Sequence, residues 1–117
     1  MVENMTNEQQ LKELERDEKI AKVNVDLGNA LDSLRTNRHF NKIIVEGYFK
    51  EEAIRLVHLK ADPAMQCPEK QAAILREMDA IGSLASYLTV IDQRARMAGK
   101  QLKDIEVART DILEGNE

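Results

Sequence analysis

The sequence predicts an all-α fold in which two long helices pack antiparallel and are joined by two short helices. Three observations predict it: only two prolines and five glycines occur in 117 residues, charged residues make up 32% of the chain, and aromatic residues only 3%. With so few bulky side chains, paired helices rich in Leu, Ile, Val, Met and Ala fit better than a thick globular core. We expect a coiled-coil-like seam between the long helices and a single helical domain over residues 1–117.

The first long helix is expected over residues 7–36, after a frayed segment at residues 1–6. Thr6 and Gln9 have the residue types and spacing of a capping box. Gly28 lies within the helix and costs about 1 kcal/mol relative to Ala in an exposed helix. We attribute it to the close approach of another helix, with a kink as the alternative. Apolar residues recur in steps of three and four and mark one face. They are Leu11, Leu14 and Ala21, and more densely Ile20, Val23, Leu27, Ala30, Leu31 and Leu34.

Residues 37–62 are expected to form an elbow of two short helices. Asn37 can cap the first of them, and Gly47 is interpreted as its C-terminal stop in the left-handed conformation. Asp62 and Pro63 should end the second, because proline disfavours helical geometry in the residue before it. Phe40 and Phe49 flank Gly47, and we interpret them as the side chains that pin this elbow.

The second long helix is expected over residues 68–113, with Pro68 as a first helical residue. At 1.5 Å per residue, about 45 residues span roughly 68 Å, more than the first helix can cover. Either Gly82 or Gly99 should break the helix, or its ends should contact other chains. Its apolar residues follow heptad-like steps, with charged Arg109 in one skipped position: Ile74, Met78, Ile81, Ala85, Leu88, Ile91, Ala95, Ala98, Leu102, Ile105 and Ile112.

Some apolar side chains are expected to pack in the contacts between the helices. On the long helices they are Ile81, Leu88, Ala95 and Leu102 with Leu27, Leu31 and Leu34, and at the elbow they are Phe40, Ile44, Phe49 and Leu56.

Composition and charge exclude several classes of function. The net charge of −4 argues against nucleic-acid binding through global charge. Cys67 is the one cysteine and cannot form an internal disulfide, which favours a reducing compartment. The chain has no apolar signal core and no run of about 18 apolar residues. We therefore expect a soluble, cytoplasmic protein with no membrane partner.

No group of residues has the spacing of a catalytic or metal site. His58 and Asp62 are four residues apart, but His39 and Cys67 complete no zinc motif. Cys67 has no accompanying general base. We expect no catalytic residue, no metal and no cofactor, and we interpret the protein as a non-enzyme.

The elbow is the candidate partner-binding surface because it is locally basic. Residues 35–60 contain six lysines and arginines but only three glutamates, whereas residues 1–20 contain more acidic than basic residues. Opposite local charges can bring copies together or attract another protein. The candidate binding residues are Arg35, Arg38, Lys42, Lys50, Arg55 and Lys60.

Two stretches carry a resemblance to a known group of proteins. The run FNKIIVEGYFKEEAIRLVHLKADP, followed by ILREMDAIGSLASYLTVID, resembles small all-helical proteins of tailed bacteriophages. In these a phenylalanine, an apolar pair, a central glycine, an EEAxRLV-type helix and an Asp-Pro turn recur in that order. The resemblance covers residues 37–94. It implies a phage protein, located in the host cytoplasm or the virion, with a part in virion assembly as a scaffold, core or connector-associated subunit.

The function expected from all of this is a structural or interaction protein that acts through helix–helix association. Its partner would be a copy of itself or another phage or host protein. The alternative is a small regulator or inhibitor that binds a host protein or nucleic acid through the basic elbow at residues 35–60.

Overall fold

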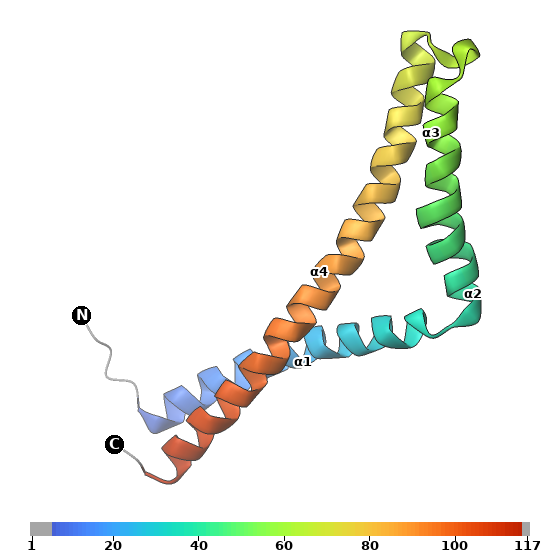
Figure 1. The fold of residues 1–117 in the computed structure, drawn as a ribbon. Coiled ribbons are helices and arrows are strands. Elements are labelled where there is room, and N and C mark those ends of the chain that lie inside the picture. Colours follow the sequence, from blue (N-terminus) through green and yellow to red (C-terminus); the bar gives the residue numbers. More distant parts are fainter. Residues whose placement is uncertain (1–5, 116–117) are drawn as a thin grey trace. The chain divides into compact units, whose positions relative to one another are not determined.

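The computed structural model of the protein describes residues 6–115 and contains helices and no strand in that range (Figure 1). The all-α prediction is confirmed. The fraying expected for residues 1–6 concerns mostly residues 1–5, which lie outside the described residues. Contacts divide the described residues into two compact units, one of residues 6–30 with 91–115 and the other of residues 31–90.

The first unit is a pair of antiparallel helical segments. It contains most of α1 (Asn7–Arg35) and the C-terminal half of α4 (Pro68–Leu113). Glu18 pairs with Arg109, and ten residues further along α1, Gly28 meets Ala95. The two segments therefore run in opposite directions. Thr6 and Gln9 form the expected capping box, with N–H···O distances of 2.9 and 3.1 Å.

Side chains that are buried or half-buried form a continuous line between these two segments, which we call the seam. Both helices contribute to it in steps of three and four, as expected for helices that stay in contact over several turns. Small residues from both helices occupy its middle. The seam consists of Leu11, Leu14, Glu18, Ala21, Val25 and Gly28 on α1, and of Ile91, Ala95, Ala98, Leu102, Ile105, Arg109 and Ile112 on α4.

Only part of the apolar set expected on α1 packs: Leu11, Leu14, Ala21 and Leu31 are buried or half-buried. Ile20, Val23, Leu27 and Leu34 are 59%, 65%, 44% and 42% exposed, so the prediction that Leu27 and Leu34 pack was wrong. The packed face is less hydrophobic because Ala and Gly let the two backbones approach closely, and hydrophobicity alone does not reveal that preference.

The second unit contains the elbow and the N-terminal part of α4. The elbow runs through α2 (Arg38–Phe40), the π-helix η1 (Asn41–Glu52) and α3 (Ala53–Ala61), followed by the 3₁₀ turn η2 (Pro63–Met65). Asn37 caps α2 as predicted, because its side chain accepts from the N–H groups of His39 and Phe40. Asp62 is extended and ends α3, also as predicted.

The prediction that Gly47 stops a helix was wrong. Gly47 lies inside η1, and within residues 6–115 the only glycine with positive φ is Gly115, at 73°. The residues that bound η1, Phe40 and Ala53, both have right-handed helical geometry. The chain therefore continues from α2 into α3 without a left-handed stop.

Leu56 of α3 is the centre of the core of the second unit, where it packs with Ile74 and Ile81 of α4. Tyr48 and Phe49 pack against this core with ring centroids 5.9 Å apart. The elbow thus covers the part of α4 that was expected to extend beyond its partner. Of the two alternatives left open for this helix, the break is excluded, since α4 runs unbroken through Gly82 and Gly99.

The remaining packing candidates agree with the structure to different degrees. Leu31, Leu56 and Ile81 are buried. The half-buried candidates are Phe40, Ile44, Phe49, Leu88, Ala95 and Leu102.

Candidate interaction surfaces

The six basic residues of the elbow are all exposed and lie in the second unit, from the end of α1 to α3. Arg55 donates two hydrogen bonds to Glu52, at 2.9 and 2.6 Å, and lies 3.8 Å from Glu77. The hydrogen bonds from Arg55 hold the pKa of Glu52 below its ordinary value. Part of the basic charge of the elbow is therefore balanced by neighbouring carboxylates.

Of the other five basic residues, two form ion pairs with nearby carboxylates and three do not. Arg35 lies 3.9 Å from Asp32, and Lys50 lies 3.6 Å from Glu46. Arg38, Lys42 and Lys60 form no ion pair with another residue in the described part of the chain. The positive charge available to a partner is thus concentrated on these three side chains.

The histidines and the cysteine do not come together. His39, His58 and Cys67 are exposed. Between Thr6 and Gly115 there is no group of three or more His, Cys, Asp or Glu side chains placed to hold a metal ion. Cys67 precedes the first residue of α4, and its carbonyl accepts the N–H of Gln71 at 3.0 Å. No helix in the same range is long and apolar enough to cross a bilayer.

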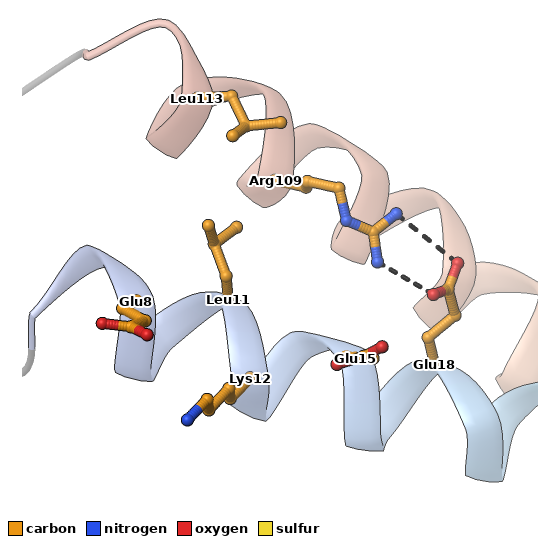
Figure 2. A pocket seen from close by; sticks show the side chains of 7 residues that line it. All are labelled: Glu8, Leu11, Lys12, Glu15, Glu18, Arg109 and Leu113. Carbon is orange, nitrogen blue, oxygen red and sulfur yellow. Dashed lines mark hydrogen bonds and ion pairs between the residues drawn. The ribbon is translucent and has the colours of Figure 1, made fainter.

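The seam contains an ion pair, formed by Arg109 of α4 and Glu18 of α1. Arg109 donates hydrogen bonds from both terminal nitrogens to the carboxylate of Glu18, at 2.9 and 3.5 Å (Figure 2). It also donates to Glu106 at 3.4 Å. The side chains of Arg109 and Glu18 are 25% and 23% exposed. The hydrogen bonds from Arg109 hold the pKa of Glu18 below its ordinary value, and the same contact raises the pKa of Arg109.

An open groove of about 480 Å³ lies next to this ion pair. In Figure 2, Leu11 and Arg109 point across the space between the two helices, whereas Lys12 points away from it. The groove mixes apolar and charged side chains. Its lining is Glu8, Leu11, Lys12, Glu15, Glu18, Arg109 and Leu113.

Gly28 and Ala95 form the closest approach within the seam. A Cβ atom added to Gly28 would lie 2.3 Å from the Cβ of Ala95, far inside van der Waals contact. The prediction that Gly28 marks the close approach of another helix is confirmed. Neither helix can take a larger side chain here without moving its neighbour.

A line of exposed apolar residues, which we call the outer stripe, lies on α1 away from the seam. It consists of Ile20, Val23, Leu27 and Ala30, spaced by three, four and three residues. Their spacing in the sequence predicted a packed face, which the structure contradicts. The signal that would have corrected it is the small-residue line at Ala21 and Gly28, which has the same spacing.

The ion pair in the seam was missed in the sequence analysis, although Arg109 was recognised as an interruption of the apolar pattern. Glu18 occupies the matching kind of position on α1, between Leu14 and Ala21. Two opposite charges that each interrupt an apolar line are a signal for a pair across antiparallel helices.

No protein-family profile, curated protein or solved structure matches this chain.

Proposed function

We propose that this is a non-enzymatic structural or interaction protein that acts by helix–helix association with copies of itself. The observation that supports the proposal is the number of large apolar side chains that are exposed, compared with the number that are buried. Within residues 6–115, eight apolar residues are buried, two of them alanines, whereas twelve large apolar residues are exposed. A chain that exposes more large apolar side chains than it buries has surface left for a partner.

Scattered exposed apolar residues are common on monomers and would not support this proposal by themselves. Ile20, Val23 and Leu27 are not scattered, because they follow one another on a single face of α1. A helix that packs on one side only is expected to be polar on the other. The regular spacing supports association through a helix face.

The titratable groups support a role without catalysis. Among the described residues, the clear pKa shifts are those of Glu18, Glu52, Arg55 and Arg109. All four result first from hydrogen bonds within arginine–carboxylate pairs, and none of these groups lies in an enclosed cavity. Perturbed groups of this kind are common in structural ion pairs.

The resemblance described above supports a more specific form of this proposal. In that form the protein is encoded by a tailed bacteriophage, uses coiled-coil-like packing, and assists virion assembly in the host cytoplasm or within the virion. Mass spectrometry of purified virions from a phage that carries the gene tests the virion form. Its detection at a fixed copy number is expected, and its absence would leave only an assembly role outside the virion.

Size-exclusion chromatography with multi-angle light scattering tests the association itself. We expect a mass that is a multiple of the chain mass of 13.3 kDa over a wide range of loading concentrations. A mass of one chain at every concentration, up to the millimolar range, would overturn the proposal.

A second candidate function is a regulator that binds nucleic acid through the elbow. The exposure of Arg38, Lys42 and Lys60, without ion pairs to described residues, favours it. Fluorescence anisotropy with a labelled oligonucleotide should then show affinity that falls steeply with added salt. Replacing these three residues by Ala should abolish binding, whereas replacing Arg94, Lys100 and Lys103 should not. No binding at low salt would exclude this candidate.

A further inference from the structure

We draw no further inference here: the strongest candidate, the outer stripe of exposed apolar residues on α1, lies away from the seam, and nothing in the structure shows what covers it.

Discussion

At the scale of single residues, the contact between Gly28 and Ala95 sets how closely the two helical segments of the first unit approach. Gly28→Ala adds a methyl group 2.3 Å from the Cβ of Ala95. Overpacking of this kind costs about 1–3 kcal/mol, which outweighs the roughly 1 kcal/mol that Ala contributes through helix propensity. Urea unfolding should therefore show a net loss of stability.

Gly99→Ala is the matched control for this prediction. It adds the same methyl group to a helical glycine where, apart from its chain neighbours and the backbone of its own helix, no atom lies within 4 Å of the added position. Propensity alone should then stabilise the protein by about 0.5–1 kcal/mol. If both variants shifted stability in the same direction, the close contact would not matter for folding.

The ion pair between Glu18 and Arg109 predicts a specific dependence of stability on pH. Hydrogen bonds from Arg109 hold the pKa of Glu18 in the folded protein below its ordinary value of 4.5. The charged pair therefore contributes stability above pH 4.5, and this contribution is lost as the pH falls through the lowered pKa. Glu18→Gln should reduce the melting temperature at pH 7, and the deficit should shrink as the pH drops below 4.5.

Glu13→Gln is the control for this measurement, since Glu13 is exposed on the same helix. It should change the melting temperature little. A deficit for Glu18→Gln that stays constant from pH 7 to strongly acidic solution would show that the pair does not act through its charge.

At the scale of elements, the π-helix η1 should be less stable than the α-helices around it. Runs of this geometry are rare and usually limited to a single turn, yet η1 spans twelve residues, Asn41–Glu52, of which none is buried. Hydrogen exchange should be faster for its amides than for those in the middle of α4, because exchange reports local opening. Equal protection in both helices would contradict this prediction.

Element boundaries were largely predictable from the sequence, because the residues that set them act locally. Asn37, Asp62 and Pro68 occupy the positions that their cap and proline chemistry indicates. The stop at Gly47 was wrong because glycine is also compatible with a continuous helix, and nothing local reveals the π geometry. The packed face of α1 was wrong because the approach of α4 depends on small residues on both helices.

The candidate surfaces were less predictable than the elements. The basic residues of the elbow were found from charge alone. The pairs of Lys50 with Glu46 and of Arg55 with Glu52 follow from helical spacing, whereas the contact of Arg55 with Glu77 depends on the fold. The outer stripe contains Ile20, Val23 and Leu27 close together in the sequence, which made it resemble a core. Separating the packed face from the exposed face required the position of Ala95 opposite Gly28.

At the scale of the whole molecule, association predicts that thermal stability depends on protein concentration. A dimer that forms only from folded chains stabilises the folded state by mass action. The melting temperature of the wild-type protein should therefore rise with concentration. A wild-type melting temperature that is constant over a hundredfold range of concentration would contradict self-association coupled to folding.

The exposed thiol of Cys67 has a practical consequence. It is the one cysteine in the sequence, and it precedes the first residue of α4. The unmodified chain can thus carry a single nitroxide spin label at a defined position, without any cysteine substitution. In a symmetric assembly of two copies, pulsed electron paramagnetic resonance would then report one distance between the labels.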